Sequence, residues 1–188
     1  MPSVVGPDGT QWPAGSLRGL EHKSIRDFVQ LAADEGYLSG RVLDYGCGKQ
    51  PYRAIVEDAG GEYEGFDLVE HPANVSGEDI GEDLLWDANA WDAILCNQVV
   101  QYVPFEYVTT FFDNLKQHLF TDGFLVMTYA TNWPEVEPED LHRFTKSGME
   151  RLLTEAGFEI VKHEWRALAA RAQSGEAFAT GYGVIARA

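Results

Sequence analysis

The chain has 188 residues, a length that favours one domain with a core large enough to fold without disulfides or metal ions. Its 30 acidic residues outnumber its 14 basic ones and give a formal net charge of −16, and the basic residues are scattered singly, so we expect neither a nucleic acid nor an anionic membrane surface as a partner. No apolar run approaches the roughly 20 residues of a membrane span, and residues 1–6 lack the basic-then-apolar pattern of a secretory signal. The two cysteines, Cys47 and Cys96, predict buried free thiols in a reducing cytoplasm. We expect the protein to be a monomer or a homodimer.

The first 37 residues predict an extended arm followed by a helix. Residues 1–15 are rich in Pro and Gly and contain Trp12, for which docking on the core and covering a cofactor are the two alternatives. Ser16 is a typical helix N-cap and Gly36 a typical stop. Apolar residues recur between them at helical spacing and should face the sheet: Leu17, Leu20, Ile25, Phe28, Val29 and Ala32. Polar residues on the opposite face should be solvated, with lining of the cofactor entrance as the alternative: His22, Lys23 and Arg26.

A strand, a glycine turn and a helix are predicted next. The apolar residues of 41–45 indicate a short buried strand, which Asp44 closes. Gly46 and Gly48 permit a tight turn and let a ligand approach bare backbone. Pro51 suits the first position of a helix over 51–59, where its missing N–H has no cost. This order is that of a nucleotide-binding βα unit.

Two acids near the turn bear on the choice of cofactor. Asp67 ends the next predicted strand, 62–67, at the distance where such folds place a carboxylate on a ribose hydroxyl. A dinucleotide site needs a third glycine, where this chain has Gln50 and Pro51. Asp44 would repel a pyrophosphate but suits a cationic ligand such as S-adenosylmethionine, which carries an ammonium and a sulfonium. The glycine turn alone supports the alternative of a nicotinamide-dependent reductase.

The second half of the chain predicts alternating strands and helices. Asn97 and Gln98 follow an apolar strand and should face the crevice where open α/β sheets bind ligands. In chain order, the expected elements are a loop at 69–78, a strand end at 79–80, a strand at 91–97, a helix opened by 102–104, a turn at 122–123, a strand at 124–129, a polar loop at 130–145, a helix at 146–156 capped by Thr145 and ended by Gly157, and antiparallel strands at 158–164 and 181–187. The helix opened by 102–104 has a predicted apolar stripe of Phe105, Val108, Phe112, Leu115 and Leu119.

The run Val42–Gly48 resembles the first motif of class I S-adenosylmethionine-dependent methyltransferases. Residues 51–53 are similar to the G-x-G-x-x-P-Y variant of a type 11/12-like subgroup, and the resemblance covers roughly residues 38–163, continuing in 65–68, 91–99 and 115–126. It implies a Rossmann-like, doubly wound α/β fold: a mostly parallel seven-stranded sheet with an antiparallel last strand and helices on both faces. It also implies one methyltransferase domain over 1–188, in which 1–37 form the N-terminal arm and helix and 130–145 the acceptor loop.

The same resemblance implies that S-adenosylmethionine is the cofactor and S-adenosylhomocysteine the product. The residues that it places at the cofactor are Asp44, Gly46, Cys47, Gly48, Tyr52, Asp67, Leu68, Asp79, Ile80, Asn97 and Gln98. Asp79 would contact the adenine amine, with Asp83 as the rival. Many relatives have His where this chain has Gln101, so a role of that His does not transfer.

A hydroxyl acceptor must lose a proton during methyl transfer, so the reaction needs a general base. His142 is the first candidate, because Asp140–Thr145 resembles the D-x-x-R-F-T stretch of methyltransferases that act on glycan-like or small hydroxylated molecules. Asp140 could orient it, and Tyr129 is a weaker candidate. The alternative is that these residues only hold the loop in place. We therefore expect O-methylation of a small-molecule or glycan-like acceptor, with no metal site. The departures at Gln50 and Gln101 motivate a second hypothesis, a silent cofactor-binding or regulatory protein.

Overall fold

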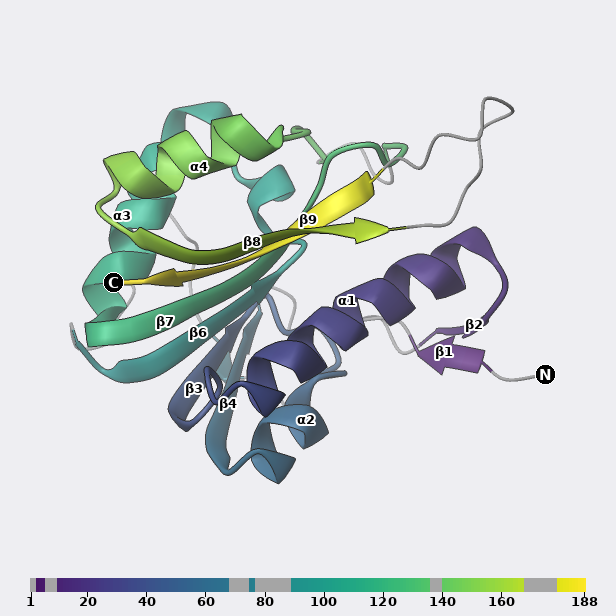
Figure 1. Cartoon of the computed structure of the whole chain (residues 1–188), viewed down its shortest axis with the longest axis horizontal. Helices are drawn as coiled ribbons and strands as arrows, with labels where there is room; N and C mark the ends of the chain where they lie inside the picture. The colour runs from purple at the N-terminus through teal and green to yellow at the C-terminus, as the bar shows by residue number, and fades with distance from the viewer. Residues whose placement is uncertain (1–2, 6–9, 68–74, 77–88, 136–139, 168–178) are drawn as a thin grey trace.

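The computed structural model describes residues 3–5, 10–67, 75–76, 89–135, 140–167 and 179–188. Within them lies a seven-stranded sheet with helices packed on both faces (Figure 1). The strand order is β5-β4-β3-β6-β7-β9-β8, in which β9 runs antiparallel to both of its neighbours. This order confirms the predicted doubly wound, mostly parallel sheet with an antiparallel last strand.

The elements alternate along the chain as a doubly wound fold requires. The strands are β1 (Ser3–Val5), β2 (Gln11–Pro13), β3 (Gly40–Tyr45), β4 (Gly61–Asp67), β5 (Val75–Ser76), β6 (Trp91–Asn97), β7 (Leu119–Ala130), β8 (Glu159–Ala167) and β9 (Ala179–Arg187). The helices are α1 (Leu17–Asp34), α2 (Arg53–Asp58), α3 (Val108–His118) and α4 (Lys146–Glu155), with short 3-10 turns η1 (Val100–Tyr102) and η2 (Phe105–Tyr107). The β1–β2 hairpin stands apart from the main sheet.

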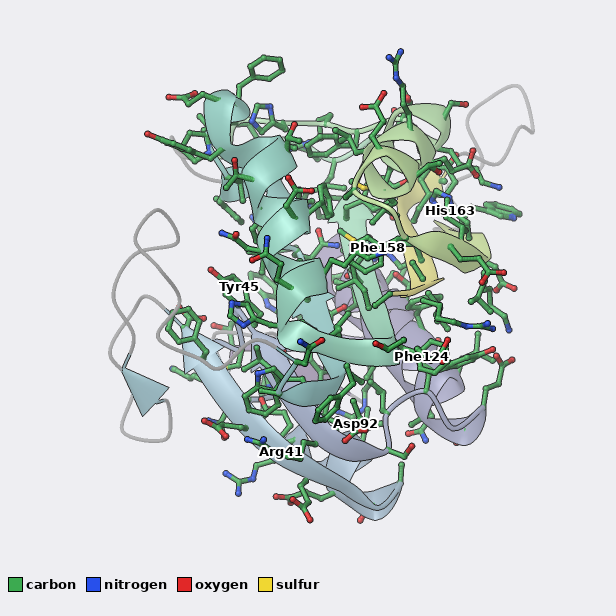
Figure 2. The ribbon with its side chains drawn as sticks, turned by 90° about the vertical axis from the view of Figure 1, so that its left-hand side faces the viewer. Arg41, Tyr45, Asp92, Phe124, Phe158 and His163 are labelled. Carbon is green, nitrogen blue, oxygen red and sulfur yellow. The ribbon has the colours of Figure 1, made fainter. Side chains whose placement is uncertain are left out.

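Each face of the sheet has its own apolar core. On one face α1 and α2 pack over β3, β6 and β7, with Ile25, Val29 and Val56 fully buried. On the other face α3 and α4 cover the sheet, and Tyr45 of β3 lies beside α3 with its ring 5.8 Å from that of Phe111 (Figure 2). The central strands are therefore covered on both sides, which explains why β6 is apolar almost throughout.

Two helix starts follow the sequence prediction. The Ser16 hydroxyl accepts a hydrogen bond from the Gly19 backbone N–H at 3.1 Å at the start of α1. The Thr145 hydroxyl does the same for the N–H of Gly148, also at 3.1 Å, at the start of α4. Each hydroxyl satisfies a backbone donor that the first turn of a helix leaves without a partner.

Other local predictions are wrong. Pro51 lies in the turn before α2, which begins at Arg53, because Gln50 adopts a left-handed φ of 57° and extends the turn. Val75–Ser76 was predicted as loop but pairs with the end of β4 as strand β5. The turn expected at 122–123 is an irregularity inside β7, where Asp122 has φ 67°. The strand end predicted at 79–80 lies outside the described residues.

The apolar faces of two helices were also predicted too broadly. Leu17 and Leu20 at the start of α1 are 63% and 36% exposed. Phe105 is 82% exposed, because the chain makes two 3-10 turns before α3 begins at Val108. Periodicity places these residues on the apolar face, but the sheet ends before it reaches them.

The arm and the cysteines agree with the sequence analysis. Trp12 docks on α1, with its ring centroid 6.5 Å from that of His22 and the Arg18 guanidinium 5.4 Å from the indole centroid. Cys47 and Cys96 are buried, and the described residues form no disulfide. Among the described residues, no helix combines the length and apolarity needed to cross a membrane.

Candidate functional site

The candidate site lies where the parallel strands β3, β4, β6 and β7 end. Their carboxyl ends meet at one edge of the sheet, which is where open α/β sheets bind ligands. β3 leads into the glycine turn, β6 leads into η1, and β7 leads into the loop over 131–145. Side chains predicted from distant parts of the sequence therefore meet here.

The glycine turn is tied to the end of β4 by three backbone donors. The N–H groups of Gly46 and Cys47 both donate to the carbonyl oxygen of Phe66, at 2.8 and 2.9 Å. The N–H of Gly48 donates to Oδ2 of Asp67 at 2.7 Å. Gly46 has φ 76°, and a Cβ there would lie 2.2 Å from Val99 Cγ2, so both its backbone and its surroundings require glycine.

Asp44 places a buried carboxylate beneath this turn. It is 1% exposed, and its Oδ2 accepts a hydrogen bond from the Tyr63 hydroxyl at 2.6 Å. Its other oxygen, Oδ1, is buried and has no hydrogen-bond partner among the described residues. Burial raises the pKa of Asp44 to about 7, against the lowering effect of the Tyr63 hydrogen bond and with a smaller raising effect of Asp67. Because an unsatisfied buried carboxylate is costly, this oxygen is suited to a cationic or hydrogen-bond-donating ligand.

An amide cluster follows the end of β6. Asn97 Oδ1 accepts from the Thr128 hydroxyl at 2.9 Å, and Gln98 Nε2 donates to the same hydroxyl oxygen at 3.1 Å. Gln101 Nε2 donates to Gln98 Oε1 at 3.3 Å. Gln98 has φ 58°, an unusual backbone conformation for a residue with a side chain and one that concentrates at functional sites. Asn97 Nδ2 and Gln101 Oε1 are buried and make no hydrogen bond within the described part of the chain, so both can serve a ligand.

A cavity of about 130 Å³ opens beside this cluster, between α1 and the loops that follow β6 and β7. Its lining combines polar and apolar side chains: Arg18, Glu21, His22, Ile25, Gln98, Gln101, Tyr102, Ala130, Trp133 and Asp140. The loop wall is held in place by the N–H groups of Leu141 and His142, which both donate to the carbonyl oxygen of Gln101, at 2.8 and 3.2 Å. The cavity is thus built from three separate segments of the chain.

Two buried or half-buried ion pairs support the cavity walls. Arg166 of β8 lies 2.8 Å from Glu21 of α1, and Thr180 donates to the other Glu21 oxygen at 2.6 Å. Both charged side chains of this pair are at most 7% exposed. Asp140 accepts a bidentate pair of hydrogen bonds from Arg143, each at 2.5 Å, and these bonds raise the pKa of Arg143 further. Both acids that line the cavity are therefore already neutralised by an arginine.

Comparison with known proteins decides the family. A family model described as a methyltransferase domain matches residues 17–163. The chain belongs to this methyltransferase family. The prediction of a class I methyltransferase that uses S-adenosylmethionine is thereby confirmed at the level of family and fold, and the alternative of a reductase is not supported.

Solved structures share the fold of this methyltransferase at low identity. The 1,6-didemethyltoxoflavin-N1-methyltransferase of Burkholderia thailandensis, with bound 1,6-didemethyltoxoflavin and S-adenosylhomocysteine, has a TM-score of 0.70 at 18% identity over 87% of this chain and 77% of that chain. A SAM-dependent methyltransferase of Archaeoglobus fulgidus has a TM-score of 0.68 at 16% identity, over 92% and 100%. The [4+2]-cyclase SpnF has a TM-score of 0.65 at 17% identity, over 86% and 80%. No curated protein matches the sequence.

The residues of this methyltransferase fit its cofactor. The unsatisfied Asp44 oxygen suits the ammonium of S-adenosylmethionine, because an ion pair would remove the cost of leaving it buried alone. Gly46 and Gly48, with φ 76° and 50°, leave bare backbone where a ligand can approach closely. Asp67 is half-buried at the end of β4, and its Oδ2 accepts a hydrogen bond from the Gly48 N–H.

The other predicted cofactor residues divide into three groups. Cys47 lies in the turn, and burial together with the charge of Asp44 raises the pKa of its thiol to about 12, so it is no nucleophile at neutral pH. Tyr52 is 6% exposed and packs under α1, where burial raises the pKa of its phenol. Asn97 and Gln98 lie in the amide cluster. Leu68, Asp79 and Ile80, with the rival Asp83, lie outside the described residues.

The predicted catalytic residues lie apart from one another. His142 is half-buried, with Nε2 2.9 Å from the carbonyl oxygen of Val103, and its ring packs between those of Phe105 and Phe144. It does not line the cavity, whereas Asp140 does, bound to Arg143.

Tyr129 points to the opposite face of the sheet. Its hydroxyl is 2.8 Å from Nε2 of His163, whose Nδ1 is 3.0 Å from Glu150 of α4. Figure 2 shows His163 on β8 on the side of α4. Tyr129 is fully buried, and burial raises the pKa of its phenol, so it is poorly placed to act as a base at the cavity.

Helix α1 contributes more to the site than the sequence predicted. His22 was expected on the solvated face, with lining of the cofactor entrance as the alternative, and it lines the cavity together with Arg18 and Glu21, for which no such role was predicted. The signal in the sequence is the spacing of positions 18, 21, 22 and 25, which fall on one side of a helix. No local pattern in the sequence predicts the ion pair between Arg166 and Glu21, because β8 and α1 come together only in the tertiary fold.

Proposed function

We propose that this methyltransferase transfers the methyl group of S-adenosylmethionine to a hydroxyl oxygen of a small acceptor bound in the cavity beside α1. The observation that carries the proposal is the unsatisfied Asp44 oxygen before the glycine turn, at the same edge of the sheet as the cavity that Gln98 and Gln101 line. When bound, the cofactor supplies a methyl group on a good leaving group, so the protein mainly has to align the acceptor. A protein of the same fold that binds S-adenosylhomocysteine together with 1,6-didemethyltoxoflavin supports an acceptor of small size.

Three polar groups of the chain have the cofactor as their proposed partner. Asp44 holds the ammonium, and its contact with Tyr63 keeps the carboxylate in one orientation. Asp67 accepts from the ribose hydroxyls, with its position set by the Gly48 N–H. Asn97 offers its free amide donor at the end of β6, where the methyl donor and the acceptor have to meet.

Two histidines compete for the role of proton acceptor. The resemblance to the D-x-x-R-F-T stretch favours His142, but its Nε2 donates a hydrogen bond to the carbonyl oxygen of Val103, and the residue does not line the cavity. His22 lines the cavity directly, as does Gln101, whose amide cannot take a proton. An imidazole changes its charge near neutral pH and suits this task. We assign the role of general base to His22. His142 has the role of holding the acceptor loop against η1.

The test begins with binding and then follows the methyl group. Calorimetry of the purified protein should detect S-adenosylmethionine and S-adenosylhomocysteine and no NAD. With a radiolabelled methyl donor and a panel of small hydroxylated acceptors, label should appear on an acceptor oxygen. Binding without transfer to any acceptor would favour a silent cofactor-binding protein, and label on nitrogen would overturn the assignment of the acceptor atom.

Matched variants separate the two histidines. His22→Gln should lower turnover about 100-fold or more and leave the affinity for S-adenosylhomocysteine within about 3-fold, by the usual size of a general-base effect. His142→Gln should instead raise KM for the acceptor, because it loosens the loop wall. The reverse pattern would return the role of base to His142, and Lys23→Gln, an exposed neighbour of His22, serves as the control.

A further inference from the structure

The cavity beside α1 accommodates a group about the size of one ring. Its volume of about 130 Å³ is close to that of a cavity of roughly 150 Å³ that binds benzene. Trp133 and the fully buried Ile25 both line it. A ligand of this size is held mainly by contacts between the substituents on its ring and the side chains of the cavity. The charges of those side chains therefore decide the class of substrate.

Among the residues that line the cavity, Arg18 is an arginine that no described acid neutralises. Of the charged residues that line the cavity, Glu21 is paired with Arg166, and Asp140 is paired with Arg143. Arg18 makes no ion pair with any residue that the structure describes, and its guanidinium rests 5.4 Å from the centroid of the Trp12 ring. The side chain is exposed, so it lies at the mouth of the cavity rather than in its floor.

We propose that the acceptor carries an anionic group, such as a carboxylate, which Arg18 binds at the mouth of the cavity while the ring of the acceptor lies inside. A guanidinium binds a carboxylate through two parallel N–H donors, and the Trp12 ring holds the guanidinium in place without neutralising it. This inference rests on the proposed function, because it assumes that the acceptor occupies this cavity.

The overall charge of the protein makes this local cation informative. With a formal net charge of −16, the surface as a whole disfavours anions. At physiological salt the screening length is about 8 Å, so distant acids have little effect at the cavity and the nearest charge dominates. Arg18 lines the cavity and makes no ion pair with the described residues, so it is suited to bind a negatively charged ligand there.

The experiment uses pairs of ring-sized hydroxy compounds that differ only in charge. Binding of 4-hydroxybenzoate and of 4-hydroxybenzamide is measured by calorimetry on the full chain saturated with S-adenosylhomocysteine, and the 3-hydroxy pair is measured in the same way. The acid should bind about 10-fold or more tightly than its amide, which corresponds to one charge-assisted contact. The preference should shrink between about 50 mM and about 500 mM salt.

Two arginine variants on α1 provide the control. Arg18→Gln should abolish the preference for the acid, whereas Arg26→Gln should keep it, because Arg26 lies on the same helix, is exposed and reaches the Pro51 carbonyl oxygen instead of the cavity. Equal binding of acid and amide, or equal loss in both variants, would overturn the inference and leave the proposed function intact. Failure of the unaltered protein to bind S-adenosylhomocysteine would overturn both.

Discussion

The pKa of Asp44 predicts that cofactor affinity depends on pH. Burial raises this pKa from 3.8 to about 7 in the protein without ligand, so near neutral pH the carboxylate is only partly ionised. The proposed contact with the ammonium of the cofactor needs the ionised form. The ammonium itself is an α-amino group, which stays protonated below about pH 7. Between about pH 5.5 and 7, protonation of Asp44 should therefore decide the affinity.

The size of the effect follows from the ionised fraction. With a pKa of about 7, roughly half of Asp44 is ionised at pH 7 and roughly 3% at pH 5.5. If only the ionised form binds, the apparent Kd rises as that fraction falls, so affinity should drop about 15-fold over this range. The sequence pI of about 4.5 keeps the protein negatively charged and away from its isoelectric point at both values.

Calorimetry with S-adenosylhomocysteine measures this dependence without turnover. At about pH 6, binding should release close to one proton per site, which appears as a dependence of the measured heat on the buffer. Asp44→Asn should bind weakly at every pH and release no proton, because an amide cannot titrate in this range. Asp67→Asn should weaken binding but keep the pH slope. A flat profile in the unaltered protein, with Asp44→Asn binding equally well, would refute the assignment of Asp44 to the ammonium.

The same pKa shift makes Asp44 unfavourable for stability above its unfolded value, so folding stability should fall as pH rises from about 4 to about 7, and Asp44→Asn should remove up to about 4 kcal/mol of this loss in denaturant unfolding at pH 8. Asp67→Ala should weaken binding of S-adenosylmethionine about 5- to 150-fold in calorimetry, because the ribose hydroxyls lose their acceptor; unchanged affinity would contradict its placement. Gly46→Ala should lower the unfolding free energy by about 1–3 kcal/mol more than Gly60→Ala, since both have positive φ but only position 46 meets a neighbouring side chain. Arg166→Met should cost about 3–5 kcal/mol, because it leaves the Glu21 carboxylate buried without its cation, and a cost below 1 kcal/mol would mean that water replaces the arginine.

Much of the fold was predictable from local patterns in the sequence. The continuous apolar run of 91–97 predicted a strand covered on both faces, and the caps at Ser16 and Thr145 predicted the starts of two helices. The glycine turn was predictable from its glycines. At Gly46 the positive φ and the close side chain of Val99 exclude most other residues, so glycine at this position indicates such a turn. These features depend on contacts within a few residues, or on burial that period and composition report directly.

Apolar periodicity failed where the chain runs past the sheet. Leu17 and Phe105 carry the same spacing signal as buried neighbours, yet both are largely exposed. The positive φ of Gln50 extends the turn, so that α2 begins at Arg53, and residue preferences do not predict this φ. In each case the local signal was present, and the position of the sheet edge or the path of the turn decided the outcome.

The sequence from Val42 to Asp67 by itself determined the proposed cofactor side, because one strand, one turn and the next strand bring Asp44, the glycines and the second acid together within a short stretch. The proposed acceptor side was decided only by the tertiary structure. Its cavity joins α1, η1 and the loop after β7, and the pair of Glu21 with Arg166 spans segments that no local pattern relates. Which acids are neutralised, and hence that Arg18 is left without an ionic partner in the described part of the chain, depends on those long-range contacts, since the charge of a site is the sum over everything packed around it.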